Sequence, residues 1–261
     1  MTKFVTLTTD FGLNDSYVGQ VKGVILKINP NVNLIDITHQ IPAWDVLRGA
    51  FVLNSFYKYF PKGTIHLVVV DPTVGSKRKR LLIQTRDYVF VGPDNGIFSF
   101  IYENEEIREI LEIRNNKFFL NQESSTFHAR DIFAPVVGYL SWGVEISQFG
   151  PKVKDCVKLN LPLPEIKKDS IKGEIIYIDR FGNLISNISR EHLNGFEKTK
   201  VSLTIGNRKI EKLSRSYSDA KPKQILALVN SSNLLEISVR QNRADEVLNV
   251  KIGDKLGINL K

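Results

Sequence analysis

The sequence predicts an α/β fold with two parts: an N-terminal, mostly parallel sheet with helices on both faces, and a smaller C-terminal antiparallel β-barrel domain. Strand-like and helix-like segments alternate in the first part, and only short β-rich runs follow a stretch rich in proline and lysine. The length of 261 residues is also near the size at which one core divides into two. We therefore predict an N-terminal α/β domain over residues 1–160, a linker over 161–171 and a C-terminal β-barrel domain over 172–261.

The first predicted unit is strand, helix, strand. Residues 4–8 read "FVTLT", a short β-rich run, and residues 32–38 read "VNLIDIT". Between them, apolar residues recur at helical spacing over residues 18–28, behind Asp15 and Ser16, which are residue types that cap helices. This segment therefore predicts an amphipathic helix between two strands.

A second helix is expected over residues 44–60, where Pro61 ends it, and a third strand over residues 64–70. The alternation of strands and helices predicts parallel pairing with helical crossovers. The remaining elements expected in this domain are strands over residues 80–85 and 88–96 and helices over residues 97–103 and 129–143.

The composition is that of an ordinary globular protein, with 42% hydrophobic and 25% charged residues. The net charge of +8 lies mostly after residue 160 and is scattered, so we expect no nucleic-acid partner. No apolar run has the length of a signal peptide core or a membrane span, so we expect no membrane association. Cys156 is the only cysteine, which excludes an intrachain disulfide and suits a cytoplasmic location.

Three carboxylates lie at or just beyond predicted strand ends: Asp10, Asp71 and Asp179. The ligand site of an open α/β sheet lies beyond the carboxyl ends of its strands, so these residues are candidates for binding or catalysis. For any one of them alone, a turn-forming or helix-capping aspartate is the more common interpretation.

Several common motifs are missing. The first predicted strand leads into "TTDFGLND", which contains neither of the glycine-rich patterns that bind dinucleotides or nucleoside triphosphates. No G-x-S-x-G sequence marks a nucleophilic serine. The histidines show no spacing typical of a metal site, so we expect no metal; they are His39, His66, His128 and His192.

Seven segments, in the same order over nearly the whole chain, resemble one family. They read "TTDFG…DSYVGQVKG", "DITHQIPAWDV", "VVVDPTVGS", "VGPDNG", "TFHARDIFAP", "IDRFGN" and "VNSSNLLEI". In these segments the chain resembles the S-adenosyl-L-methionine (SAM) hydrolases, also called SAM hydroxide adenosyltransferases, which are relatives of the SAM-dependent fluorinase and chlorinase.

The resemblance implies hydrolysis of SAM to adenosine and L-methionine by attack of water or hydroxide at C5′ of the ribose, with SAM as substrate and no cofactor. It also implies a homotrimer, with each active site between the N-terminal domain of one subunit and the C-terminal domain of its neighbour. Carried over residue by residue, the catalytic set of the family falls on Asp71, Arg78 and His128.

These residue types suit the implied reaction. Methionine leaves a sulfonium as a neutral thioether and needs no proton, so the difficulty lies in making water nucleophilic. Asp71 would accept a proton from the water, and the permanently cationic Arg78 would favour a hydroxide-like nucleophile. His128 would orient the water or take part in removing its proton. Which of the three handles the proton stays open in the sequence.

The resemblance also implies a set of substrate-binding residues spread over both predicted domains. They are Asp10 for the ribose hydroxyls, Asn183 for adenine, Asp179 and Ser231 for the methionine amine and carboxylate, Asp15 at the methionine end, Trp44 and Phe181 as apolar walls, and Glu236 and Val239 near the face of the C-terminal domain.

The chain departs from the halogenases at informative places. It has His128-Ala129 where they carry a Tyr-Ser pair, Asp71 where they carry a tyrosine, and Ser232 where they carry an arginine that helps to hold the methionine carboxylate. An acidic residue beside the nucleophile would repel a halide anion, which favours hydrolysis. The alternatives are a SAM-dependent halogenase, a non-catalytic SAM or adenosine sensor, and a basic nucleic-acid-binding module.

Overall fold

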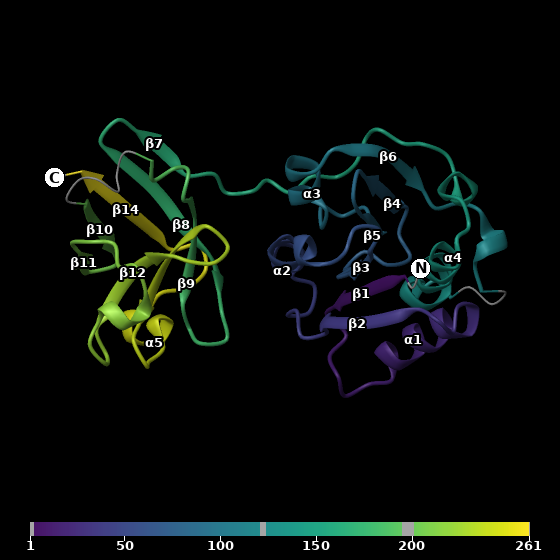
Figure 1. Ribbon diagram of the computed structural model, residues 1–261, viewed down its shortest axis with the longest axis horizontal. Helices are drawn as coiled ribbons and strands as arrows, with labels where there is room; N and C mark the ends of the chain where they lie inside the picture. The colour runs from purple at the N-terminus through teal and green to yellow at the C-terminus, as the bar shows by residue number, and fades with distance from the viewer. Residues whose placement is uncertain (1–2, 121–123, 195–200, 261) are drawn as a thin grey trace. The chain divides into compact units, whose positions relative to one another are not determined.

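The computed structural model describes residues 3–120, 124–194 and 201–260. The chain divides into two compact units, Met1–Leu159 and Asn160–Lys261 (Figure 1). The predicted fold class is confirmed, because the first unit is an α/β unit on a mostly parallel sheet and the second is an antiparallel, barrel-like sheet. Among the described residues, no helix combines the length and apolar character that crossing a membrane requires.

The first unit is built on a six-stranded sheet in the order β2-β1-β3-β5-β4-β6. The four strands β2, β1, β3 and β5 run parallel, whereas β4 is antiparallel to both of its neighbours. The strands are β1 (Phe4–Thr9), β2 (Asn33–Thr38), β3 (Ile65–Val69), β4 (Arg80–Thr85), β5 (Val89–Pro93) and β6 (Ile107–Glu112).

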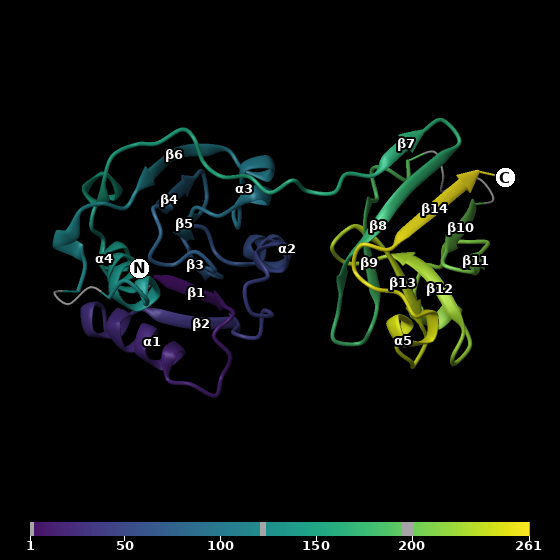
Figure 2. The same cartoon turned by 180° about the vertical axis from the view of Figure 1, so that it is seen from behind.

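Helices cover both faces of this sheet, as the two opposite views show (Figures 1 and 2). One face carries α1 (Tyr17–Ile28) and α4 (Ala134–Trp142), and the other carries α2 (Val46–Phe56) and α3 (Ser99–Asn104). The central strand β3 is buried on both sides, which explains its continuous apolar sequence. Its consecutive residues Leu67 and Val68 point to opposite faces and enter the two separate cores.

Two helices differ from the prediction. The helix expected over residues 44–60 begins at Val46, because the side chain of Asp45 accepts a hydrogen bond from Arg48 N and caps it, and a 3₁₀ turn over Tyr57–Tyr59 follows α2. The segment expected as one helix over residues 129–143 is a π-helical turn over Ala129–Phe133 that continues into α4. Further 3₁₀ turns cover Asn116–Phe118 and Ile146–Phe149.

The second unit is an antiparallel sheet in the order β11-β10-β14-β8-β9-β13-β12, with β7 added on β8. A bridge between Leu213 and Ala227 brings the two ends of this order together and gives the sheet its barrel-like shape. The elements are β7 (Glu165–Lys167), β8 (Ser170–Ile178), β9 (Leu184–Ser189), β10 (Val201–Ile205), β11 (Arg208–Ile210), β12 (Ile225–Val229), β13 (Leu234–Val239), α5 (Ala244–Leu248) and β14 (Lys255–Leu260), with a 3₁₀ turn over Tyr217–Asp219.

Part of the stretch expected as a linker forms a hairpin. Strand β7 pairs with the start of β8, with Glu165 opposite Lys172 and Lys167 opposite Ser170. The lysine-rich composition that suggested a linker is also what a short, exposed edge strand tolerates, because charged side chains there point into water.

Candidate active site

The carboxyl ends of β1 and β3 lie side by side, because the two strands pair in parallel as far as Thr9 and Val69. Asp10 directly follows β1, and Asp71 comes two residues after the end of β3. Both side chains line one pocket of about 250 Å³. Two of the three predicted strand-end carboxylates therefore share a site at the carboxyl edge of the sheet.

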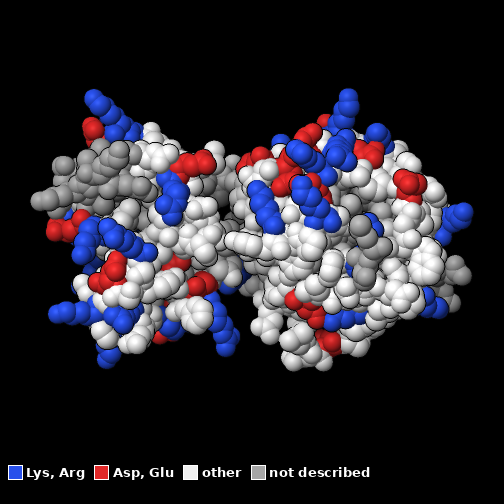
Figure 3. Space-filling view, viewed as in Figure 1, with Lys and Arg blue, Asp and Glu red and all other residues white. Residues whose placement is uncertain are grey.

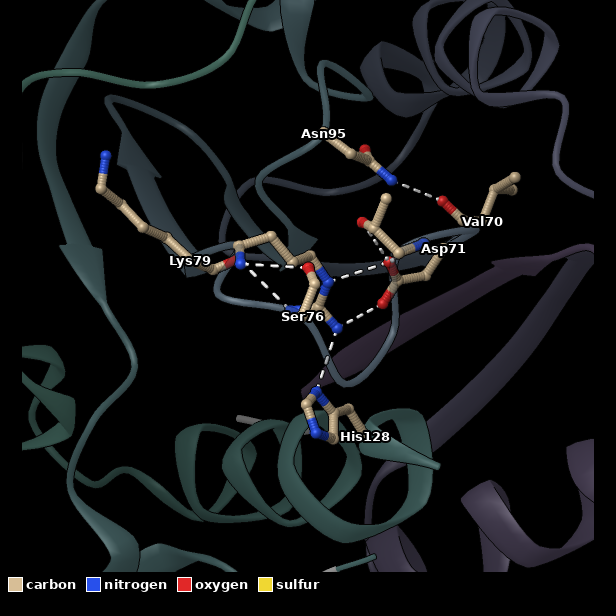
Figure 4. Close-up of polar contacts among 8 residues, drawn as sticks. Val70, Asp71, Ser76, Lys79, Asn95 and His128 are labelled. Atoms are coloured by element: carbon tan, nitrogen blue, oxygen red, sulfur yellow. Dashed lines mark hydrogen bonds and ion pairs between the residues drawn. The ribbon is translucent and has the colours of Figure 1, made fainter. Parts of the chain in front are cut away.

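Asp71, Arg78 and His128 form a continuous chain of polar contacts (Figure 4). Arg78 donates from Nε to Asp71 Oδ1 at 2.9 Å and from Nη2 to Asp71 Oδ2. The same Nη2 lies 3.1 Å from Nδ1 of His128. The side chains of Asp71 and Arg78 are each 6% exposed, and His128 is buried. The structure thus brings the three sequence-predicted catalytic residues together.

The contact between Arg78 and His128 fixes the tautomer of the histidine. A guanidinium has donors only, so Nδ1 of His128 accepts the hydrogen bond and carries no proton. The imidazole is therefore neutral in this arrangement, with its proton on Nε2. His128 and Asp71 also line the same pocket.

The loop between β3 and β4 contains the cationic run "SKRKR", and only part of that run faces the site. Arg78 turns inward to Asp71, whereas the guanidinium of Arg80 lies 5.3 Å from the centre of the Phe119 ring. Lys77 is exposed. Gly75 has a φ of +81°, and a Cβ there would lie 2.6 Å from the carbonyl oxygen of Ser125. Glycine therefore lets the loop pack against the segment that leads to His128.

Asp10 is held by a backbone contact across the pocket. Its Oδ2 accepts a hydrogen bond of 2.9 Å from Trp44 N, and Trp44 has a φ of +68° and is 73% exposed. Burial raises the pKa of Asp10; the hydrogen bond from Trp44 opposes this rise, and the charge of Asp71 adds to it. Asp10 thus lies partly buried close to a second carboxylate.

Three aromatic rings form one wall of the pocket. Phe11, Tyr17 and Phe127 meet edge to face, with ring centres 5.2 to 6.1 Å apart. Phe11 and Tyr17 were not among the predicted site residues, although both stand inside matched segments, "TTDFG" and "DSYVG". The other lining residues beside the two carboxylates, Trp44 and His128 are Ala43, Val69, Val74, Thr126 and Ala129.

Asp15 lies just before α1, and its side chain is exposed. It is not among the residues that line the pocket. Nor does it cap α1: the N-cap residue is Ser16, whose side chain makes no capping bond and accepts a hydrogen bond from Gln20 Nε2 instead.

In the second unit, Asp179 and Asn183 close the turn between β8 and β9. Oδ1 of Asp179 accepts hydrogen bonds from the backbone N–H groups of Phe181 and Asn183, at 2.8 and 2.9 Å, and Oδ2 accepts one from Asn183 Nδ2 at 2.9 Å. The ring of Phe181 is 74% exposed at the tip of the turn. Three predicted binding residues therefore belong to one structured turn, in which Asp179 already serves as an Asx-turn acceptor.

The other predicted residues of this unit differ in exposure. Ser231 is exposed in the turn between β12 and β13. Glu236 is buried and accepts hydrogen bonds from Tyr217 Oη, Asn230 Nδ2 and Ser238 Oγ at 2.7, 3.2 and 2.6 Å. Val239 is 3% exposed and packs in the core of the unit. Its side chain therefore belongs to the core of this unit. The sequence alone did not show which face of β13 points into the core.

Charges of both signs mix on the face of the molecule in Figure 3, where Lys and Arg are interspersed with Asp and Glu. Within the described parts of the chain, no three His, Cys, Asp or Glu side chains are grouped in a way that could hold a metal ion. The Arg78 guanidinium places a positive charge beside the pocket, where it is bonded to Asp71.

Comparison with known proteins places these residues in a family. The model of the SAM hydroxide adenosyltransferase N-terminal domain matches residues 5–150, and that of the C-terminal domain matches residues 173–257. A protein of Methanocaldococcus jannaschii named (R)-S-adenosyl-L-methionine hydrolase is 37% identical, over 97% of this chain and 95% of its own length. A fluorinase of an Actinoplanes species is more distant, at 26% identity over 72% of each chain.

A solved structure gives the same answer for the fold. An uncharacterized conserved protein from Thermotoga maritima superimposes with a TM-score of 0.91 at 35% identity, over 99% of this chain and all of its own. The two family models together cover most of the chain, including the segments that carry Asp71, Arg78 and His128. The chain is therefore a member of the SAM hydroxide adenosyltransferase family, as its seven matching segments predicted.

Proposed function

We propose that this protein hydrolyses SAM to adenosine and L-methionine by attack of water at C5′ of the ribose. The observation that carries the proposal is the Asp71–Arg78–His128 chain, two members of which line a pocket at the carboxyl edge of the sheet. Family membership and the names of the more similar relatives support the same reaction. The roles below are assigned to the residues of this chain on that basis.

The attacking water would lie beside Asp71 and His128. With its proton on Nε2, His128 would donate a hydrogen bond to the water oxygen and hold its lone pair in line with C5′. Oδ1 of Asp71 accepts bonds from Arg78 Nε and from the backbone N–H and hydroxyl of Thr73. Oδ2 accepts from Arg78 Nη2 and retains a second lone pair, so Oδ2 of Asp71 is the atom we assign to accept the proton of the water. Arg78 would stabilise the hydroxide character that develops during attack.

Asp10 would hold the ribose hydroxyls, since it is the second carboxylate of the pocket and lies across from Asp71. The exposed ring of Trp44 and the Phe11–Tyr17–Phe127 wall would pack against the nucleoside and keep bulk water away from the sulfonium. Asp10 and Asp71 together would favour a cationic substrate over a neutral one.

The methionine and adenine ends are assigned to the second unit. We assign adenine to Asn183 beside Phe181, and the methionine amine and carboxylate to Asp179 and Ser231. Asp15 of the first unit is also assigned to the methionine end. Glu236 would contribute indirectly, through the side chains that donate hydrogen bonds to it, among them Tyr217.

The proposal includes a homotrimer in which the N-terminal unit of one subunit and the C-terminal unit of its neighbour complete each site. The exposed aromatic residues Trp44 and Phe181 support it, because aromatic residues are enriched at protein–protein interfaces. Sedimentation of the full chain tests this part separately. We further propose a cytoplasmic location, which suits the single thiol of Cys156.

No metal or cofactor is needed in this scheme, because methionine leaves as a neutral thioether and Arg78 supplies the positive charge at the nucleophile. Activity should therefore be unchanged by a chelator such as EDTA. A loss of activity on chelation that is restored by adding a metal would contradict this part of the proposal.

The experiment that tests the function is chromatography of fresh SAM incubated with the purified protein, with and without chloride. We expect adenosine and methionine in equal amounts under both conditions. A 5′-chlorinated nucleoside would indicate a halogenase, and tight binding without product would indicate a sensor. Salt-dependent binding of DNA or RNA with no effect on SAM would indicate the nucleic-acid module instead.

A further inference from the structure

The loop that carries Asp71 and Arg78 passes over the end of a third strand, which lies between the two strands that the loop connects. The loop leads from β3 to β4, and β5 lies between these two strands in the sheet. Asp94 and Asn95 directly follow β5, so they emerge between the two ends of the loop. Parallel strands β3 and β5 end at the same edge, which places these two residues at the edge of the sheet where the loop begins.

The first end of the loop is bound by Asn95. Val70 lies beyond the paired part of β3, because the pairing with β1 ends at Val69 and the pairing with β5 ends at Leu67. The carbonyl oxygen of Val70 instead accepts a hydrogen bond of 2.7 Å from Asn95 Nδ2 (Figure 4). Asn95 Oδ1 accepts from Ile97 N at 3.2 Å, which fixes the direction in which the amide points.

The second end of the loop is bound by Asp94. Its N–H donates to the carbonyl oxygen of Lys79 at 3.0 Å, which continues the β4–β5 ladder by one step beyond the pair Arg80–Pro93. The carboxylate of Asp94 accepts from Val157 N at 2.8 Å and lies 3.8 Å from Lys79 Nζ. Arg78, one residue before Lys79, is thereby held at a fixed place relative to β5.

From these contacts we infer that Asn95 is a positioning residue that sets the separation of Asp71 and Arg78, an inference that rests on the proposed function. Asn95 bonds to the residue before Asp71, while its neighbour Asp94 bonds to the residue after Arg78. These two bonds tie both ends of the loop to the dipeptide Asp94-Asn95. Asn95 is not among the residues that line the pocket, so we expect it to act through the catalytic pair and not on the substrate.

The chain offers a matched control in Asn115. Its Nδ2 donates to a distant carbonyl, that of Gln148, at 2.8 Å, and its Oδ1 accepts from the backbone N–H two residues on, that of Lys117, at 3.2 Å. These are the same two kinds of bond that Asn95 makes. Asn115 lies before the 3₁₀ turn Asn116–Phe118, outside the catalytic loop and the pocket.

The kinetic test compares Asn95→Ala with Asn115→Ala in the full chain. Each variant loses two side-chain hydrogen bonds of the same kinds, so we expect similar falls in Tm. Only Asn95→Ala should lower kcat, by about 10- to 100-fold, because a displacement on the order of 1 Å in a catalytic group has that effect. The Kd for adenosine should stay within about twofold in both variants, since the nucleoside site does not use the loop closure.

A second variant separates positioning from simple loss of bulk. Asn95→Asp keeps the acceptor for Ile97 N but turns an oxygen toward the Val70 carbonyl. Its kcat should be low at neutral pH, and its ratio to wild-type kcat should rise as the pH falls, because the protonated carboxyl regains a donor. A pH-independent ratio would contradict the role of the Asn95–Val70 bond.

A readout independent of SAM turnover keeps this inference apart from the proposed function. The Nε–H resonance of Arg78 in a ¹H–¹⁵N spectrum reports its bond to Asp71. We expect faster solvent exchange of this proton in Asn95→Ala and an unchanged rate in Asn115→Ala. An unchanged Arg78 signal in Asn95→Ala would overturn the inference even if the wild type hydrolyses SAM. If the wild type does not hydrolyse SAM but the Arg78 signal changes in Asn95→Ala, only the proposed function is overturned.

Discussion

Both carboxylate oxygens of Asp71 accept hydrogen bonds from one guanidinium, that of Arg78, and each of these two side chains is only 6% exposed. A two-point contact of this kind requires the planar fork of arginine. Removing two charges from water is costly, so the pair is a poor choice for stability alone. Its place beside the pocket indicates that the geometry serves chemistry.

Replacing Arg78 by lysine should lower kcat by about 100- to 1,000-fold, because an ammonium cannot bond both oxygens of Asp71 and contact His128 at once. Adenosine affinity, measured by calorimetry, should change little. Arg80→Lys is the control, since Arg80 lies over Phe119. Equal activity of Arg78→Lys and wild type would remove Arg78 from the catalytic set.

His128 should act through Nε2 and not through Nδ1. In His128→Asn the amide falls near the position of Nδ1 and preserves a partner for Arg78, whereas in His128→Gln the amide reaches the position of Nε2. We expect His128→Asn to lower kcat by about 100-fold and His128→Gln to retain more activity. Single-turnover kinetics with saturating enzyme checks this, and the reverse order of the two variants would contradict it.

Adenosine binding should weaken in acid because of Asp10. Burial raises the pKa of Asp10, so this carboxylate gains its proton at a higher pH than an ordinary aspartate does. The bonds to the ribose hydroxyls that we propose for Asp10 would weaken as it is protonated, so wild-type affinity should fall as the pH drops through that raised pKa. Asp10→Asn should bind adenosine about 10- to 100-fold more weakly at neutral pH.

The control for this measurement is Asp87→Asn, a surface position paired with Lys62. Calorimetric titrations of adenosine between pH 4 and 8 should show a flat profile for Asp10→Asn and the wild-type profile for Asp87→Asn. A wild-type pH profile retained in Asp10→Asn would mean that another group controls binding.

His66 should make the first unit sensitive to acid. It is fully buried, it stacks on Phe90, and among the described residues its Nε2 has no hydrogen-bond partner. Burial lowers the pKa of His66 to about 3. In the unfolded chain the ordinary value near 6.5 applies, so between these two values only the unfolded state gains the proton.

The stability contributed by neutral His66 is therefore complete above about pH 6.5 and is lost as the pH falls, at up to about 1.4 kcal/mol per pH unit. Urea unfolding at several pH values, followed by tryptophan fluorescence, measures this effect, because Trp44 and Trp142 both belong to the first unit. In His66→Asn the slope should shrink by one proton. An unchanged slope would show that other groups cause the acid sensitivity.

The fold class could be predicted from the sequence because its signals are local. The continuous apolar run of β3 and the helical spacing of apolar residues in α1 are each set by short-range geometry, so each predicts its own element. The β7–β8 hairpin was not predictable in this way, because the lysines near Lys167 suit a linker and an edge strand equally.

Pocket residues could be predicted where a predicted strand end falls inside one of the seven segments that resemble the family, as at Asp10 and Asp71. The closure of the loop by Asn95 could not be predicted, because it depends on the position of β5 between β3 and β4 in the sheet. Strand order joins residues that are distant in sequence and leaves no local periodic signal. The burial of Val239 belongs to the same class, since it follows from the register of β13.

The most direct test of the central claim is the reaction of SAM in water enriched in ¹⁸O, followed by mass spectrometry of both products. We expect adenosine with one ¹⁸O atom at its 5′ oxygen and unlabelled methionine, with or without chloride, and no product above background from Asp71→Asn. Recovery of SAM unchanged, of a halogenated nucleoside, or of unlabelled adenosine would contradict the attack of water at C5′ within the Asp71–Arg78–His128 site.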